Sequence, residues 1–254
     1  MTSIRTCFGC LCVTAVLLAA GPASAQSTQK PTPTPASSSR ISASINFGVQ
    51  AGSGDLTYGS TPLIYDEPAR LDVAQSYESG PLFDVGGSYL IYDNFGVGLS
   101  YSRTSGDGNA TVTGQIPDPD VTDRPRGASA SADDLAHTEN AVHLQVFYRF
   151  AASPKLDISV GLGPTFYSMT QDLIDTVVVA EPGPAITPTP AEVSESPVGF
   201  NIGADATYMF NERFGAGVLL RIATGSADMA LPSGGSVEVD AGGFQFAAGL
   251  RVRF

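Results

Sequence analysis

The residues best suited to acid–base chemistry are two histidines, because an imidazole titrates near neutral pH. His137 begins the sequence HTE, and His143 begins the sequence HLQ. A hydrolytic site needs a base and usually a nucleophile beside it, whereas a lone histidine in a lumen or a loop is usually structural. We therefore interpret both histidines as structural residues and predict no catalytic site.

Acidic residues form a second candidate site. Asp118, Asp120 and Asp123 lie close together, and Asp133 and Asp134 follow. Hard divalent cations prefer several oxygen ligands, but this spacing is not that of an EF-hand, and prolines interrupt it. We therefore expect a solvated acidic loop, with no metal and no cofactor.

Composition narrows the class of protein. The 254 residues include 28 Gly and 18 Pro, and only 15% are charged, which indicates strands and loops rather than a helical bundle. The formal net charge is −12. Binding to a phosphate backbone needs concentrated Lys and Arg, so we expect no nucleic acid partner.

The N-terminus has the three parts of a secretory signal. Arg5 supplies positive charge, residues 10–20 form an apolar run, and Ala-Ser-Ala at 23–25 matches a cleavage site. The run is shorter than the ~20 residues of a spanning helix, which disfavours a membrane anchor. We predict a signal peptide over 1–25, containing all three cysteines, and a disordered Pro/Ser/Thr-rich periplasmic tail over 26–40.

Strict alternation of apolar and polar residues begins at Ile41 and continues to Gln50. This pattern is typical of a strand with two unlike faces, and its length suits the ~9–11 residues that cross a bilayer at a tilt. Seven more segments show the same pattern: about 82–91, 95–103, 140–150, 156–166, 198–210, 214–222 and 239–254. The sequence therefore predicts an all-β fold over 41–254, an eight-stranded antiparallel transmembrane β-barrel.

The connections alternate in length, which predicts the orientation. Turns near residues 93, 154 and 212 are short. The other links are long and polar: about 51–81, 104–138, 168–197 and 223–238. Short periplasmic turns and long extracellular loops are typical of outer-membrane barrels. A soluble lipocalin-like barrel is the alternative, but it would crowd the interior with Phe, Leu and Tyr.

Aromatic residues gather at the predicted periplasmic strand ends, as in an interfacial girdle. They are Tyr92, Phe95, Tyr148, Phe150, Tyr208, Phe210, Phe214 and Phe254.

Charged residues also fall on the inward face, where each should find a partner. Arg149 and Asp157 flank the second periplasmic turn, and we expect them to pair. Near the outer end, Asp84 and Glu139 are expected to face Arg221. We interpret these groups as structural ion pairs of the lumen.

The last strand ends in an aromatic residue with apolar residues at alternate positions before it: Phe254, Val252, Leu250 and Phe246. This ending resembles the closing strand that the barrel-assembly machinery reads in bacterial outer-membrane proteins. The hairpin sequence YDNFGVGL, from residue 92, resembles the first periplasmic hairpin of the OmpA/OmpX-type small outer-membrane β-barrel superfamily. The resemblance covers about 41–254 and implies a monomeric barrel in the bacterial outer membrane.

Function depends on the lumen, the loops and the lipid face. An eight-stranded barrel is just wide enough for its own side chains to fill it, so we favour a plugged lumen. We therefore expect a structural or cell-surface interaction role. A narrow porin-like channel for small polar solutes or cations is the alternative, and a lipid A-modifying enzyme is third. The partners are outer-membrane lipid and lipopolysaccharide, whose phosphates Arg103 is expected to contact.

Overall fold

The computed structural model describes residues 39–232 and 234–254, so the predicted signal peptide and nearly all of the predicted tail lie outside the described residues. Within these ranges, no helix is long and apolar enough to cross a membrane. The strands are β1 (Ile41–Ala51), β2 (Ser53–Ser60), β3 (Leu63–Ile64), β4 (Glu67–Pro68), β5 (Arg70–Glu78), β6 (Pro81–Leu90), β7 (Phe95–Ile116), β8 (Arg126–Ser153), β9 (Leu156–Ala180), β10 (Ala185–Glu195), β11 (Val198–Met209), β12 (Phe214–Ala230) and β13 (Ser236–Arg253).

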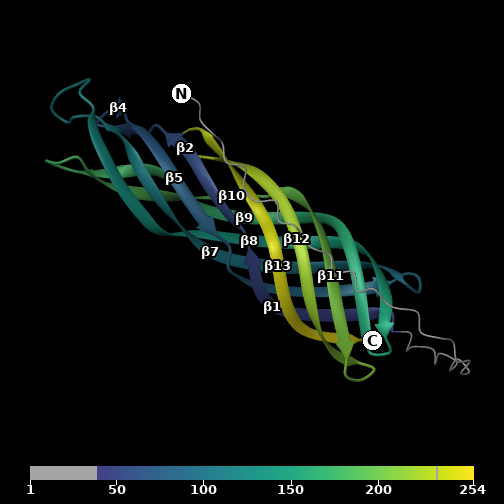
Figure 1. Cartoon of the computed structure of the whole chain (residues 1–254). Helices are drawn as coiled ribbons and strands as arrows, with labels where there is room; N and C mark the ends of the chain where they lie inside the picture. Colours follow the sequence, from purple (N-terminus) through teal and green to yellow (C-terminus); the bar gives the residue numbers. More distant parts are fainter. Residues whose placement is uncertain (1–38, 233) are drawn as a thin grey trace, which may run out of the picture. The chain divides into compact units, whose positions relative to one another are not determined.

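A ring of antiparallel strands forms the barrel, in the order β1, β6, β7, β8, β9, β11, β12 and β13. The first and last strands close it, since Ser42 lies opposite Arg253 and Ala51 lies opposite Phe244. Figure 1 shows these strands running obliquely past one another, with the C-terminus at the end of the short turns. The prediction of an eight-stranded antiparallel barrel is confirmed.

The outer wall of the ring is apolar, as the alternation predicts. On β7, Phe95, Val97, Leu99 and Tyr101 are exposed, and Leu99 is exposed to 57%. All eight predicted girdle aromatics are also exposed at the turn end. A second group that the sequence did not single out is exposed toward the other end of the belt: Phe47, Tyr101, Phe166, Phe200 and Phe244. Aromatic rings therefore border the apolar belt at both ends.

The long links are not loops, and this corrects the prediction. Strand β7 continues to Ile116 and β8 begins at Arg126, which leaves only residues 117–125 between them. Likewise, β12 and β13 are separated only by residues 231–235. The first link also contributes β2 and β5, with β5 pairing on β7, and the third contributes β10, which pairs on β9. We call residues 51–81, 104–139, 168–197 and 223–243 the outer hairpins.

The outer hairpins enclose an apolar core of their own. Val73, Val112, Leu173, Met229 and Val239 come from five strands, and none of them is exposed to solvent. Their outward neighbours on the same strands are polar and water-facing, so the inside-to-outside order of the barrel is reversed here. Residues buried from water in this way stabilise a fold by the hydrophobic effect, at about 1.5–3 kcal/mol for a fully buried side chain.

Candidate functional site

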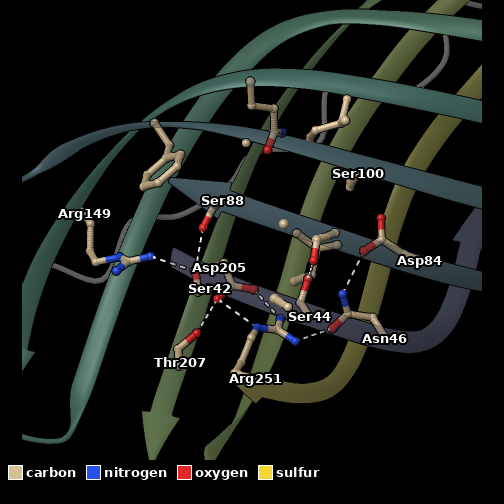
Figure 2. A pocket seen from close by; sticks show the side chains of 18 of the residues that line it. Ser42, Ser44, Asn46, Asp84, Ser88, Ser100, Arg149, Asp205, Thr207 and Arg251 are labelled. Atoms are coloured by element: carbon tan, nitrogen blue, oxygen red, sulfur yellow. Dashed lines mark hydrogen bonds and ion pairs between the residues drawn. The ribbon is translucent and has the colours of Figure 1, made fainter. Parts of the chain in front are cut away.

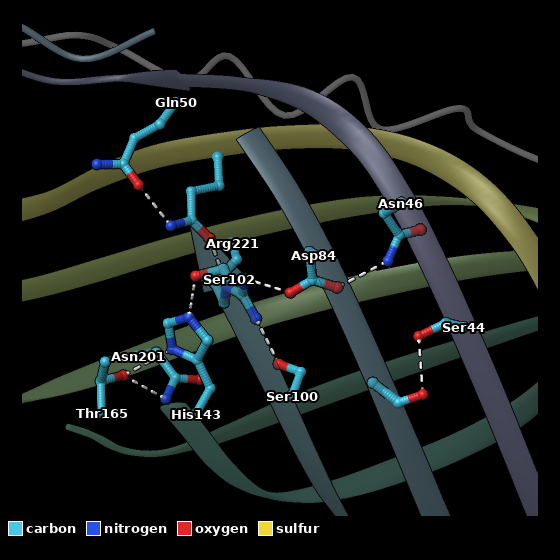
Figure 3. A network of polar contacts seen from close by, with 12 residues as sticks. Ser44, Asn46, Gln50, Asp84, Ser100, Ser102, His143, Thr165, Asn201 and Arg221 are labelled. Carbon is cyan, nitrogen blue, oxygen red and sulfur yellow. Dashed lines mark hydrogen bonds and ion pairs between the residues drawn. The ribbon is translucent and has the colours of Figure 1, made fainter. Parts of the chain in front are cut away.

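The middle of the lumen is filled by a buried polar layer, drawn in Figure 3. Arg221 and Asp84 form an ion pair at 2.7 Å, and each residue is 2% exposed. The same guanidinium donates to Gln245 Oε1 at 2.6 Å and to Ser100 Oγ at 2.9 Å. The second oxygen of Asp84 accepts from Asn46 Nδ2 at 2.8 Å. The structure thus brings together Asp84 and Arg221, and every charged oxygen and donor group in the pair has a partner, as burial requires.

Above this layer, Gln50 connects the barrel to the outer hairpins. Its amide nitrogen donates to Glu139 Oε2 at 2.9 Å and to the Gly242 carbonyl at 3.0 Å, and its oxygen accepts from Gln245 at 2.6 Å. Gly242 has a φ of 94°, a left-handed conformation that favours glycine. Its backbone nitrogen in turn donates to Glu139 at 3.0 Å. The sequence prediction missed both glutamines, although each stands at an inward position of an alternating strand.

Glu139 does not pair with Arg221 as predicted. Its other oxygen lies 2.9 Å from His137 Nε2, and His137 Nδ1 lies 2.5 Å from Gln171 Oε1. The ring of Tyr77 stacks on His137 with centroids 4.5 Å apart. The prediction was wrong because it assumed that all these charges lie at one depth. In the structure, Gln50 and Gln245 lie between the Arg221–Asp84 pair and the His137–Glu139 pair.

His143 lies between two hydroxyl groups. Its Nε2 is 2.9 Å from Ser102 Oγ, and its Nδ1 is 2.9 Å from Thr165 Oγ1. A hydrolase would orient the imidazole with a carboxylate and leave room for a substrate beside the serine. Here a neutral threonine occupies that place, and His143 is not exposed at all. The arrangement fits a structural histidine.

Below the central layer, the lumen contains a polar cavity of about 120 Å³. Serine, asparagine, aspartate and arginine side chains converge on it in Figure 2. Arg251 forms an ion pair with Asp205 and donates to Asn46 Oδ1 at 2.5 Å. Gly217 makes room for this guanidinium, because a Cβ there would lie 2.8 Å from Arg251 Cζ.

The predicted pair of Arg149 and Asp157 does not form. Asp157 pairs instead with Arg253, which reaches it from β13. Arg149 Nη2 lies 3.3 Å from Ser42 Oγ, and its guanidinium stands 5.6 Å from the centre of the Phe147 ring. The sequence placed both residues beside one turn, but Asp157 lies opposite Ala151 in the register of β8 and β9.

The outer hairpins cover the lumen. Tyr77 lies over His137 and donates its hydroxyl hydrogen to the Asp240 carbonyl at 2.8 Å. Burial raises the pKa of Tyr77 to about 12, so the hydroxyl remains a donor. The apolar core of the outer hairpins lies on the far side of Tyr77 from the lumen. From the turn end outward, the interior therefore passes from a cavity to a buried polar layer and then to an apolar cover.

The remaining predicted residues lie on the outer surface. Leu250, Phe246 and Phe254 of the closing strand are exposed, and Val252 is half-buried. Their role in assembly stays a prediction. Arg103 faces outward where the apolar wall of β7 ends. Within the described ranges, no group of three or more His, Cys, Asp or Glu is arranged to hold a metal ion.

Comparison with known protein families shows which family this barrel belongs to. Residues 13–254 match the family described as "Outer membrane protein beta-barrel domain". The chain belongs to this family. Membership implies the bacterial outer membrane, so the short turns of this outer membrane barrel face the periplasm and the outer hairpins face outward. No curated protein sequence matches the chain.

Several solved structures are similar to this barrel. The outer membrane protein OprG from Pseudomonas aeruginosa is 13% identical, with 84% of this chain and 94% of that one covered and a TM-score of 0.45. The N-terminal β-barrel domain of OprF from Pseudomonas aeruginosa is 16% identical, with coverages of 85% and 98% and a TM-score of 0.40. Neisserial surface protein A is 11% identical, with coverages of 84% and 97% and a TM-score of 0.41. Similarities this low transfer no function to the present chain.

Proposed function

We propose that this barrel acts at the cell surface, holding an acidic β-structured head outside the membrane while its lumen stays closed. The observation that carries the proposal is the reversed polarity of the outer hairpins, which gives them an apolar core and a water-facing polar surface. Loops that only connect strands need no such core. A folded head of this kind is suited to binding a partner with a defined surface.

The charge of the head indicates the chemistry of that partner. The outer hairpins carry 20 of the chain's 25 acidic residues, all but Glu139 at least partly exposed, and only 3 of its 13 lysines and arginines. Such a surface attracts cationic molecules and repels polyanions. The proposed partner is therefore a basic protein or peptide outside the cell.

Binding tests this proposal directly. The refolded protein in lipid nanodiscs should bind poly-lysine, with an affinity that falls as salt rises, and should not bind heparin. Replacing Asp118, Asp120 and Asp123 by asparagine should weaken poly-lysine binding by several-fold. Replacing Asp93 and Glu212 at the periplasmic turns by amides is the matched control and should leave it unchanged. Equal binding of poly-lysine and heparin would contradict the proposal.

A narrow channel is the second candidate, because the periplasmic half of the lumen contains the polar cavity described above. The buried Arg221 layer and the apolar cover argue against a water-filled path through the protein. The purified barrel in a planar bilayer should give no discrete conductance steps. Reproducible steps would favour the channel over the closed barrel.

Lipopolysaccharide is proposed as a lipid partner of Arg103. This side chain is exposed at the outer border of the apolar belt, beside the exposed ring of Tyr101. A guanidinium there can bind a phosphate of the outer leaflet through two parallel hydrogen bonds. Arg103→Gln should reduce the lipopolysaccharide that copurifies with the protein, whereas Arg213→Gln at a periplasmic turn should not.

The proposal includes that the barrel is a monomer without catalytic activity. The hydroxyls of Ser102 and Thr165 beside His143 resemble a nucleophile and its base, and all three side chains are buried. Hydrolysis of lipid A or a peptide by the purified protein would overturn this part of the proposal.

A further inference from the structure

The arginines of the lumen differ in how their charge is balanced. Arg221 pairs with Asp84, Arg251 with Asp205 and Arg253 with Asp157. Arg149 is half-buried among them, and no carboxylate of the described residues lies within ion-pair distance of it. Within residues 39–232 and 234–254, its guanidinium makes a single long hydrogen bond, to Ser42, which leaves most of its five donors without a partner there.

Arg149 also stands between two hollows. One is the lumen cavity of about 120 Å³, where its guanidinium donates to Ser42 Oγ, which is itself hydrogen-bonded to Ser88 Oγ (Figure 2). The other is a hollow of about 360 Å³ at the periplasmic mouth, which Arg149, Arg40 and Arg253 line together. A ligand in either space can therefore reach the free face of the same guanidinium.

The balance of charge at this mouth is positive. Asp93 and Asp157 are the carboxylates that line the hollow, against three arginines, and Asp157 is already paired with Arg253. Arg40 is exposed and, like Arg149, forms no ion pair within the described residues. A guanidinium in a partly dry wall gains more from an anion than one in open water, because the local dielectric is lower.

We propose that the periplasmic mouth of the barrel is a binding site for a small oxyanion, a phosphate or a carboxylate group, with Arg149 as its main ligand. The planar fork of Arg149 binds two oxygens of the anion, and Arg40 supplies a second charge from the rim. Ser42 Oγ and Ser88 Oγ lie 2.6 Å apart and share one hydrogen bond, so one of the two hydroxyls remains to donate to the anion from the inner side. The site is independent of the outer hairpins and of the proposed surface function.

Nuclear magnetic resonance of the refolded full barrel in detergent micelles tests this site. Inorganic phosphate and acetate are titrated separately at neutral pH, and the arginine Nε–Hε signals are followed. The expected result is a saturable shift of the Arg149 signal with at least one of the two anions. The relative affinities distinguish a phosphate site from a carboxylate site.

Variants separate a site from general attraction to positive charge. Arg149→Gln should weaken anion binding by about tenfold, the usual scale of a charge-assisted hydrogen bond. Arg149→Lys keeps the charge but loses the fork, and should give an intermediate affinity. Arg213→Gln is the control, since this arginine lies in another periplasmic turn away from both hollows.

These variants should retain the barrel, because among the described residues the Arg149 side chain makes only one hydrogen bond and one ring contact. Heat-modifiable migration on a denaturing gel checks that they do. The proposal is overturned if neither anion shifts the Arg149 signal, or if Arg149→Gln and Arg213→Gln reduce the affinity equally.

Discussion

The membrane ring and the outer hairpins are built from the same strands with opposite polarity. On β7 the outward residues are Phe95, Val97, Leu99 and Tyr101 up to Arg103, and beyond it they are Ser, Asp, Asn, Thr, Thr and Gln. The inward residues change in the opposite sense, from Gly and Ser to Ala, Val and Ile. The period of two stays constant, and only the identity of each face changes.

This difference shows that alternation with a period of two indicates a strand but not its orientation. The surrounding medium, lipid or water, determines which face carries the apolar residues. In the ring, lipid covers the apolar face, so the enclosed side chains are polar and must satisfy one another. In the outer hairpins, water covers the outside, so the enclosed side chains form an ordinary hydrophobic core. The two interiors should therefore fail in different ways when they are mutated.

Removing a charge from the lumen should have the largest effect. Arg221→Ala leaves Asp84 buried without its cation and should lower the free energy of unfolding by about 3–5 kcal/mol. Urea unfolding in detergent, followed by circular dichroism, measures the loss. The double variant Asp84→Asn with Arg221→Gln should recover part of it, and Arg213→Ala should have no effect. A stable Arg221→Ala barrel would mean that the polar layer does not hold the ring together.

Truncating the core of the outer hairpins should come next. Leu173→Ala creates a cavity at a site with no solvent exposure and should cost about 2–5 kcal/mol. The loss should be local: protease should cut the outer hairpins in reconstituted vesicles while the ring stays folded. Leu162→Ala lies on the lipid-facing wall of the same strand and should leave protease resistance unchanged. Equal sensitivity of both variants would contradict a separate outer core.

Introducing an arginine at either of two points on β7 compares the lipid-facing surface of the ring with the water-facing surface of the outer hairpins. Leu99→Arg places a charge within the apolar belt and should cost about 2–4 kcal/mol. Thr113→Arg lies on the same face of the same strand in the outer hairpins, and its effect should stay within about 0.5 kcal/mol. Folding yield into lipid vesicles measures both. Similar yields would place the border of the membrane elsewhere.

The smallest effect is expected at the tips of the outer hairpins. Hydrogen bonds from Arg126 and Tyr65 hold the pKa of Glu181 below its ordinary value of 4.5. A carboxyl with a lowered pKa stabilises the folded state above its ordinary pKa, and this contribution is lost as the pH falls through the lowered value. Hydrogen exchange at the amides of Glu181, Gly183 and Ala185 should therefore indicate opening as the pH falls below 4.5, the ordinary pKa of the carboxyl. Glu181→Gln should remove this pH dependence.

The sequence predicted the ring because its lipid-facing residues are large and apolar, and these make the period of two visible. It missed the strands of the outer hairpins because there the contrast is weak. On β7, for example, the inward residues Gly106 and Gly108 alternate with the outward residues Ser105 and Asp107, and none of the four is a large apolar residue. The partner strand β8 has an extra residue opposite Gly108–Ala110, where Asp134 has a φ of 59°, so the strict alternation fails in β8 at this point.

Lumen contacts were predictable only where one inward charge had one plausible partner. Asp84 and Arg221 are 137 positions apart, yet both are inward charges at a similar depth. The partners of Asp157 and Glu139 depended on the depth of each residue in the closed ring. That depth follows from the register of all ring strands together, which no single segment encodes.

The unbroken strands also set how far the head reaches from the cell. From Arg103 to Ile116, β7 extends roughly 40 Å along its own direction. With the usual barrel tilt, this corresponds to a height of about 30 Å above the apolar belt. Electrostatic screening at physiological salt acts over about 8 Å, so the acidic tips stand several screening lengths above the lipid. A cationic molecule approaching the cell would meet the field of the tips well before it senses the charge of the membrane itself.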